Sequence, residues 1–151
     1  MIKVTKNDLK KMFWRLQLLQ VSWNYERMQG IGFLYIMKPV LKRLYASADR
    51  EGRTKAIKRH LEFFNTQPTL AAPIIGITAA MEERGGNEAG QAITSLKTGM
   101  MGPLAGLGDS LIWLTWMPIC MSIGVSFAAQ GNPLGLILAL LMFNVVNIPL
   151  K

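Results

Sequence analysis

The chain has 151 residues, of which half are hydrophobic and 17% are charged, and it carries a formal net charge of +8 with a mean hydropathy of +0.24. This length corresponds to about one domain and is sufficient to bury a core. The composition lies between those of globular and integral membrane proteins. The single cysteine, Cys120, excludes an intrachain disulfide, and the residue pattern indicates no metal cluster.

The charges are unevenly distributed along the chain. Residues 1–60 contain 14 Lys/Arg and four Asp/Glu, whereas residues 61–151 contain three Lys/Arg and five Asp/Glu. A basic half can bind nucleic acid or a membrane surface, or form the cytoplasmic side of a membrane protein. Because this half adjoins an apolar one, the positive-inside rule favours a membrane protein and argues against nucleic-acid binding. The N-terminus lacks the apolar stretch of a signal peptide, so we expect the N-terminal half to stay in the cytoplasm or on the membrane face.

The first predicted element is a basic amphipathic helix. Thr5 or Asn7 can cap it, and Asp8 lies in its first turn near the positive end of the helix dipole. Apolar residues then recur every three or four positions, at Leu9, Met12, Phe13, Leu16, Leu19 and Trp23. Such a helix packs against its own protein or lies in the plane of the lipid headgroups, and its lysines and tryptophans favour a mixture of the two.

Residues 22–64 predict two further helical stretches. The apolar run 31–37 is too short to span a bilayer, and a basic helical surface continues after it. Residues 46–52 predict a loop, and residues 53–64 predict a third helix with an apolar and a basic side. We expect His60, which stands beside two basic residues, to be a surface or capping group and not a ligand or a catalytic base.

The segment 65–83 predicts a helix start followed by a short apolar helix. Asn65 and Thr66 are favoured N-caps, and Pro68 is tolerated in a first helical turn. Residues 69–81 are uncharged but too few for a span, and proline and glycine interrupt them. This pattern fits a re-entrant or broken helix whose backbone is covered by protein or lines a cavity.

A helix predicted over 88–101 leads into the glycine-rich segment 97–109. This segment lacks the preceding strand and the GK[ST] of nucleotide-binding loops, so we interpret its glycines as permitting close helix approach or as an unwound stretch lining a cavity. Residues 110–150 are uncharged, which predicts a kinked spanning helix over 110–129 and a second span over 133–150. The chain stops directly after this apolar run, and we expect it to be truncated.

These elements together predict an all-α integral membrane protein. It has a basic amphipathic N-terminal helical region that is cytoplasmic or interfacial (1–64), a segment with a short re-entrant or broken helix and polar residues (65–109), and one or two transmembrane helices (110–151).

Polar residues in apolar surroundings are the candidate binding residues. Carboxylates and amides can bind adjacent hydroxyl groups of a sugar bidentately, and transporters hold such groups near the middle of the membrane. The candidates are Asn65, Thr66, Gln67, Glu82, Glu83 and Asp109. Alternatively, they are helix caps, surface acids and a structural Lys97–Asp109 pair. The sequence shows no catalytic constellation, so we predict no catalytic residue, no metal and no cofactor.

Four motifs, read together, resemble a known family. They are SWNYERMQGIGF (22–33), RHLEFFNTQP (59–68), AAPIIGITAAMEE (71–83) and KTGMMGPLAGLGDS (97–110). In content, order and spacing they resemble the IID subunit of the mannose/fructose/sorbose family of the sugar phosphotransferase system (PTS). The resemblance covers nearly the whole chain, although IID subunits are considerably longer.

The resemblance implies a subunit of a sugar-translocating complex, multi-pass in the bacterial cytoplasmic (inner) membrane, with its N-terminus in the cytoplasm. With a IIC subunit it would form the path for a mannose-type hexose. A cytoplasmic IIAB protein would phosphorylate the sugar, with phosphate from phosphoenolpyruvate through HPr, so the chain is not catalytic alone. The sugar site would lie between IIC and IID, with Asn65 and Thr66 as the best contact candidates. IIC–IID pairs would assemble into a higher-order oligomer.

Two other functions stay open at this stage. The early end of the chain fits a non-transporting, truncated membrane scaffold or receptor fragment that docks with IIC. The basic amphipathic region 1–64 fits, less well, a protein that perturbs membranes.

Overall fold

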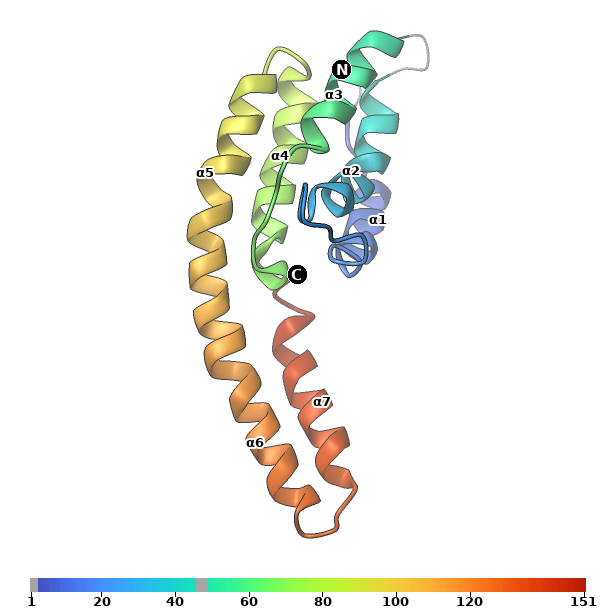
Figure 1. The fold of residues 1–151 in the computed structure, drawn as a ribbon. Coiled ribbons are helices and arrows are strands. Elements are labelled where there is room, and N and C mark those ends of the chain that lie inside the picture. Colours follow the sequence, from blue (N-terminus) through green and yellow to red (C-terminus); the bar gives the residue numbers. More distant parts are fainter. Residues whose placement is uncertain (1–2, 46–48) are drawn as a thin grey trace.

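The structure, a computed structural model, describes residues 3–45 and 49–151 and is built from helices (Figure 1). In chain order the elements are α1 (Lys6–Leu16), α2 (Gly30–Leu44), α3 (Arg50–His60), the 3₁₀ turn η1 (Pro68–Leu70), α4 (Ala72–Gly85), α5 (Gly90–Gly108), the π-helix η2 (Asp109–Trp116), α6 (Met117–Ala128) and α7 (Leu134–Asn147).

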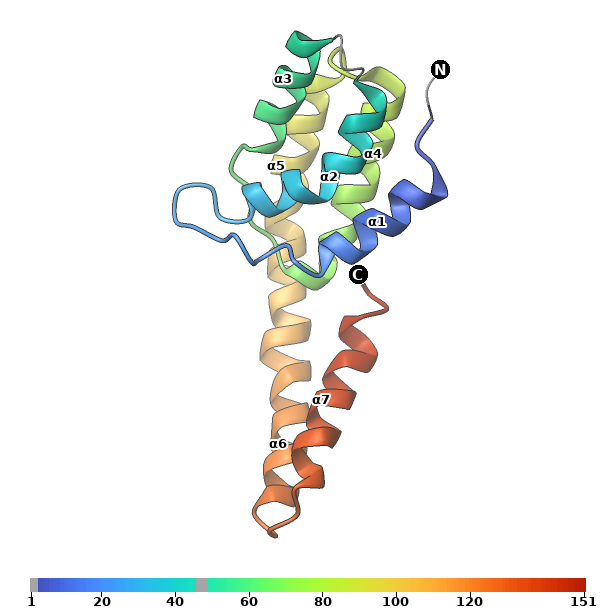
Figure 2. The same cartoon turned by 90° about the vertical axis from the view of Figure 1, so that its right-hand side faces the viewer.

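The helices form two parts, which we call the head (α1 to α5) and the hairpin (η2, α6 and α7). Figures 1 and 2 show the hairpin extending from one end of the head, with the C-terminus returning to the head. The predicted all-α fold is confirmed. The division of the chain at residues 64 and 109 stays a prediction.

Two side chains fix the start of α1. Thr5 and Asp8 form a capping box, in which the Asp8 backbone N–H donates to the Thr5 hydroxyl (3.3 Å) and the Thr5 N–H donates to the Asp8 carboxylate (3.0 Å). Leu16 is buried in the core, whereas Leu9 is 51% exposed. The predicted apolar stripe does not continue to Trp23, because the helix ends at Leu16 and the chain turns; Trp23 is 43% exposed.

Helix α2 supplies the centre of the core. Phe33, Ile36, Met37 and Val40 are fully buried, and they belong to a cluster that includes residues of α1, α3 and α4. Gly32 lets α2 approach the segment after α1, because a Cβ at Gly32 would lie 2.0 Å from the Leu19 backbone oxygen.

The predicted third helix forms, but it is shifted toward the N-terminus. Helix α3 begins at Arg50, where the Asp49 side chain accepts a hydrogen bond from the Gly52 backbone N–H (2.8 Å). The predicted loop is therefore wrong at residues 50–52, and residues 46–48 lie outside the described residues. The helix ends at His60, so residues 61–64 form a connection and not the helical turn that we predicted.

Helices α5, η2 and α6 are continuous and form one helix, Gly90–Ala128, of 39 residues. Within the described part of the chain, this is the helix that is long and apolar enough to cross a membrane. Only 17% of its most apolar window is buried, so it is not the core helix of a soluble protein. The glycine-rich segment is helical throughout, so the unwound alternative is wrong.

The helix predicted as a kinked span over 110–129 begins with a π-helical stretch, η2. The Met117 backbone N–H donates to the Ile112 carbonyl, five residues earlier, and Asp109 opens the stretch. Pro118 follows directly after the π-helical stretch, inside the continuous helix, and has no backbone N–H to donate.

Helix α7 packs against α6 through small residues. A Cβ at Gly135 would lie 2.4 Å from the Gly124 carbonyl oxygen, so the two backbones approach closely. Gly131, at φ +73°, forms the turn between them. Helix α7 has 14 residues and is about 21 Å long, which is shorter than the predicted span over 133–150.

The close approach at Gly32 gives a stability prediction. Because a methyl group there meets backbone atoms that cannot rotate away, Gly32→Ala is expected to destabilise the protein by about 2 kcal/mol. Gly76→Ala is the matched control, since nothing lies within 4 Å of a Cβ at Gly76 and alanine is the better helix former by about 0.5–1 kcal/mol. Thermal unfolding of the purified protein in detergent measures both. Equal melting temperatures for the two variants would contradict the packing described.

Candidate functional site

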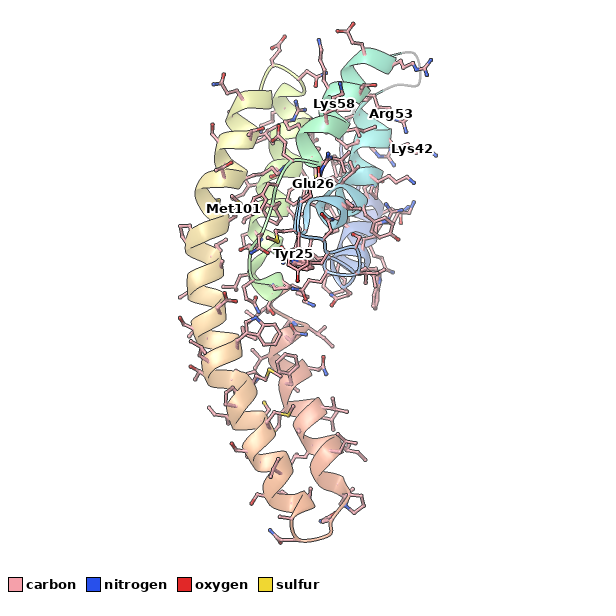
Figure 3. The ribbon with its side chains drawn as sticks, in the orientation of Figure 1. Tyr25, Glu26, Lys42, Arg53, Lys58 and Met101 are labelled. Carbon is pink, nitrogen blue, oxygen red and sulfur yellow. The ribbon has the colours of Figure 1, made fainter. Side chains whose placement is uncertain are left out.

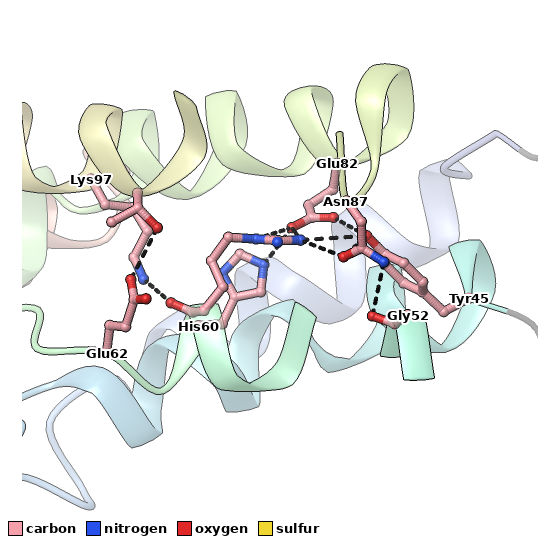
Figure 4. Close-up of polar contacts among 9 residues, drawn as sticks. Tyr45, Gly52, His60, Glu62, Glu82, Asn87 and Lys97 are labelled. Atoms are coloured by element: carbon pink, nitrogen blue, oxygen red, sulfur yellow. Dashed lines mark hydrogen bonds and ion pairs between the residues drawn. The ribbon is translucent and has the colours of Figure 1, made fainter. Parts of the chain in front are cut away.

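A buried carboxylate, that of Glu82 on α4, ties together three helices of the head (Figure 4). Its Oε1 atom accepts hydrogen bonds from Arg59 Nη2 (2.7 Å) and Nε (3.1 Å) and from His60 Nε2 (2.8 Å), and its Oε2 atom accepts one from the Tyr45 hydroxyl (2.7 Å). The Glu82 side chain is fully buried and that of Arg59 is 9% exposed. We call Tyr45, Arg59, His60 and Glu82 the Glu82 cluster.

The environment of the cluster sets the charge of its members. Burial alone would raise the pKa of Glu82, but hydrogen bonds from His60, Tyr45 and Arg59 outweigh it and hold that pKa below its usual range. Burial lowers the pKa of His60, so the imidazole stays neutral at pH 7 and uses its Nε2–H to donate to the carboxylate. Burial and the neighbouring Glu82 carboxylate raise the pKa of Tyr45. Within the Glu82 cluster, the negative charge of Glu82 and the positive charge of Arg59 therefore face each other.

The prediction for His60 is wrong, because its side chain is fully buried and stacked on Phe33 with ring centroids 5.6 Å apart. The predicted alternative of a Lys97–Asp109 pair is also wrong. The two residues stand 12 positions apart on one continuous helix, about 18 Å along its axis. Lys97 Nζ instead donates to the Arg59 carbonyl (2.8 Å), at the end of α3, and lies over the Phe33 ring.

A second set of polar residues lies where the head meets the hairpin, and we call it the junction. The Gln29 side chain holds Thr66 by both amide atoms: Nε2 donates to the Thr66 carbonyl (2.7 Å), and Oε1 accepts from the Thr66 N–H (3.1 Å). Met28, at φ +51°, turns the chain so that Gln29 reaches this position. Asn24 supports the turn by accepting from the backbone N–H groups of Glu26 (3.1 Å) and Arg27 (2.9 Å).

The motif FNTQP forms the centre of the junction. Gln67, and not Asn65 or Thr66, is the cap of η1, because its side chain accepts from the N–H groups of Thr69 (2.6 Å) and Leu70 (3.1 Å). The Thr69 hydroxyl donates to the Asn147 side chain at the end of α7 (2.8 Å). The junction therefore connects η1 with the C-terminal end of the hairpin.

Gly108 brings the long helix against this turn. A Cβ at Gly108 would lie 2.5 Å from the Gln67 Cβ, so glycine is required for the contact. Asp109 follows directly, is exposed, and is the last charged residue before Lys151. The Thr66 hydroxyl is buried and has no hydrogen-bond partner among the described residues.

The six predicted site residues thus occupy two places. Thr66, Gln67 and Asp109 lie at the junction together with the exposed Asn65. Glu82 and the partly exposed Glu83 stand at the other end of α4, about 15 Å of helix from the junction. All the hydrogen bonds of Glu82 described above are made within this chain, so the structure gives it a role in holding the head together.

Sequence reasoning did not single out Tyr45, Arg59 or Gln29. The sequence did contain a signal for Arg59. Glu82 directly follows an apolar run, and a buried acid requires a basic partner, so a basic residue elsewhere in the chain could have been expected beside it. No such signal was present for the two hydrogen bonds from the Gln29 side chain to the Thr66 backbone. They join residues 37 positions apart and depend on the positive φ angle of Met28.

A helical fold whose long apolar helix is mostly exposed, with a basic head and a polar junction, indicates an integral membrane protein. Comparison with known families makes this specific. Residues 3–151 match the model of the PTS system mannose/fructose/sorbose family IID component, and the chain belongs to this family.

Characterised relatives are similar over almost the whole chain. The mannose-specific EIID component of Escherichia coli K12 is 47% identical and matches 97% of this chain and 52% of its own length. The sorbose-specific EIID component of Klebsiella pneumoniae is 47% identical over 99% of this chain (55% of its own length), and the fructose permease IID component of Bacillus subtilis is 42% identical over 99% (54% of its own length). The chain thus spans about half the length of the curated relatives that it matches.

A solved structure has the same fold. The cryo-EM structure of the mannose transporter ManYZ in complex with microcin E492 contains a chain that superposes with a TM-score of 0.94 at 46% identity. The match covers 99% of this chain and 56% of that chain. The arrangement of head and hairpin is therefore that of a known membrane transporter.

The Glu82 cluster gives a second stability prediction. Glu82→Gln leaves Arg59 buried without its counter-charge and is expected to cost about 3 kcal/mol. Glu83→Gln, the same change one residue later at a partly exposed position, is expected to stay within about 0.5 kcal/mol of the unaltered protein. Thermal unfolding of the two purified variants in detergent compares them. A Glu82→Gln protein as stable as the Glu83→Gln protein would show that the cluster does not hold the head.

Proposed function

We propose that this chain is the IID subunit of a sugar-translocating phosphotransferase complex. With a IIC subunit it forms the path for a hexose across the bacterial cytoplasmic membrane, and a cytoplasmic IIAB protein phosphorylates the sugar during passage. Family membership supports this function, as do relatives named for mannose, sorbose and fructose and a structural match to the mannose transporter ManYZ. IIC–IID pairs assemble into a higher-order oligomer.

The observation that carries the site assignment is the contact between Gln67 and Gly108. It sets Asp109, the charged residue at the start of the apolar hairpin, beside the turn that carries Asn65 and Thr66. A carboxylate at this position is costly in a membrane unless it has a polar partner. Hydroxyl groups of a sugar supply such partners, because a carboxylate or an amide can bind two neighbouring hydroxyls.

Residues of the junction have distinct roles in this proposal. Asn65 and Asp109, both exposed, contact the sugar, and the buried Thr66 hydroxyl is available to donate or accept a further hydrogen bond. Gln67 is committed to the η1 cap and positions the others. Glu83 is a weaker candidate because of its distance along α4 from the junction.

The orientation in the membrane follows from charge. The head contains most of the basic residues of the chain, whereas residues 110–150 carry no charge. The positive-inside rule then places the head and the N-terminus in the cytoplasm, on the side where IIAB delivers its phosphate.

The proposal predicts that Asp109→Asn strongly lowers transport without unfolding the protein. The variant is produced with IIC and IIAB, and phosphoenolpyruvate-dependent uptake of mannose, fructose and sorbose is measured per unit of protein in the membrane. Because the charge–hydroxyl contacts are lost, uptake of the transported sugar is expected to fall about 10- to 100-fold, equivalent to about 1.4–2.7 kcal/mol.

Glu88→Gln is the control, since it removes the same charge from an exposed turn of the head. Undiminished uptake by Asp109→Asn would overturn the site assignment. A chain that co-purifies with IIC but supports no uptake, even unaltered, would favour a scaffold or receptor in place of a transport subunit.

A further inference from the structure

A basic groove lies between α1 and α2, on the side of the head away from α5. It has a volume of about 580 Å³ and is lined by Asp8, Lys11, Arg15, Lys38, Pro39, Lys42 and Arg43. Five cations thus surround one carboxylate. Figure 3 shows Lys42 projecting from this side of the molecule.

Two of the cations are already committed. Arg43 pairs with Asp8, whose carboxylate is also held by the Thr5 hydroxyl (2.6 Å). Burial would raise the pKa of Asp8, but the hydrogen bonds from Arg43 and Thr5 lower it to about 2, so the pair stays ionised. Arg15 donates to the Tyr35 carbonyl (2.9 Å). Lys11, Lys38 and Lys42 supply the excess positive charge of the groove.

An apolar hollow adjoins the basic groove. It has a volume of about 250 Å³ and is lined by Leu18, Val21, Ser22, Ile31, Gly32 and Tyr35. Arg15 lines the groove and Tyr35 lines the hollow, and the Arg15 guanidinium lies 4.6 Å from the centre of the Tyr35 ring. The two depressions therefore share one wall, with positive charge on one side and apolar surface on the other.

The hollow lies next to Gln17, where the hairpin meets the head, and the groove extends from there along α2 to Lys42, toward the end of the head that carries Arg53 (Figure 3). Lys151, just beyond α7, donates to the Gln17 side chain at the end of α1 (3.2 Å), and Figure 2 shows the C-terminus beside α1. Trp14 (63% exposed) and Val21 (78% exposed) project from the chain here. Exposed tryptophan beside lysine and arginine is typical of the boundary between hydrocarbon and headgroups.

We propose that the α1–α2 face binds one anionic glycerophospholipid. Its phosphate lies among Lys11, Lys38 and Lys42, and an acyl chain covers the hollow formed by Leu18, Val21 and Ile31. The charge of the groove selects an anion, and the adjoining hollow favours an amphiphile over an acidic soluble protein, which would leave apolar surface uncovered. The inference rests on the membrane location of the proposed function but not on the sugar site.

The test titrates the purified, delipidated protein in detergent with phosphatidylglycerol, phosphatidylcholine or soluble glycerophosphate, and follows bound ligand by native mass spectrometry. We expect saturable binding of one phosphatidylglycerol molecule. Phosphatidylcholine, which has no net charge, and glycerophosphate, which has no acyl chain, are each expected to bind at least about 10-fold more weakly.

Two triple variants carry the same loss of charge. Lys11→Gln/Lys38→Gln/Lys42→Gln empties the groove of its uncommitted lysines, and we expect it to weaken phosphatidylglycerol binding about 100-fold. Arg50→Gln/Arg53→Gln/Lys58→Gln removes three charges from α3, where Figure 3 shows Arg53 and Lys58 at the opposite end of the head from the hairpin, and we expect no change. Leu18→Gln/Val21→Gln tests the hollow: binding of phosphatidylglycerol weakens while that of glycerophosphate does not.

Equal losses in the two triple variants would overturn the proposal, because they would indicate general attraction and not a site. Equal binding of phosphatidylcholine, or of glycerophosphate, would also overturn it. Melting temperatures verify that every variant is folded. Since lipid binding is measured without sugar, its failure leaves the proposed transport function standing, and failure of the Asp109→Asn test leaves lipid binding unaffected.

Discussion

The head of this protein depends on one buried carboxylate. Glu82 on α4 is held by Arg59 and His60 at the end of α3 and by Tyr45 at the end of α2, so that three helices meet at one charge. Replacing either Glu82 or Arg59 leaves the other charge buried without its counter-charge, and a buried unpaired charge destabilises a protein far more than an unpaired charge at the surface does. The buried cluster around Phe33, on which the His60 ring stacks, packs the same three helices against one another.

The junction has the opposite character, because its polar groups are not all used within the chain. Gln29 and Gly108 fix the turn from two sides, one by a pair of hydrogen bonds and one by close contact. Asn65 and Asp109 are left exposed at the start of the charge-free hairpin. In the proposed function, these two exposed residues are the groups that contact the sugar.

Much of this arrangement could be predicted from sequence. Caps and periodicity located the start of α1, the lack of charge predicted the span over 110–129, and the charge asymmetry indicated a membrane protein; that this span is continuous with the helix predicted over 88–101 was not predicted. Where the predictions failed, tertiary contacts decided the outcome. His60 was expected at the surface because its neighbours are basic, yet its partner is an acid 22 residues later. Gln67, and not Asn65 or Thr66, caps η1, in a turn whose backbone Gln29 holds from 37 residues earlier in the chain. Local patterns do not encode such pairings.

The central claim is that the Glu82 cluster stabilises the head while the junction binds sugar. The most direct test is the rise in melting temperature that mannose, fructose or sorbose causes in the purified complex with IIC, since a ligand at 100 times its Kd stabilises by about 2.7 kcal/mol. The account predicts that Glu82→Gln lowers the melting temperature but keeps the sugar-induced rise, whereas Asp109→Asn keeps the melting temperature and loses the rise. A sugar-induced rise that survives in Asp109→Asn, or that disappears in folded Glu82→Gln, would contradict it.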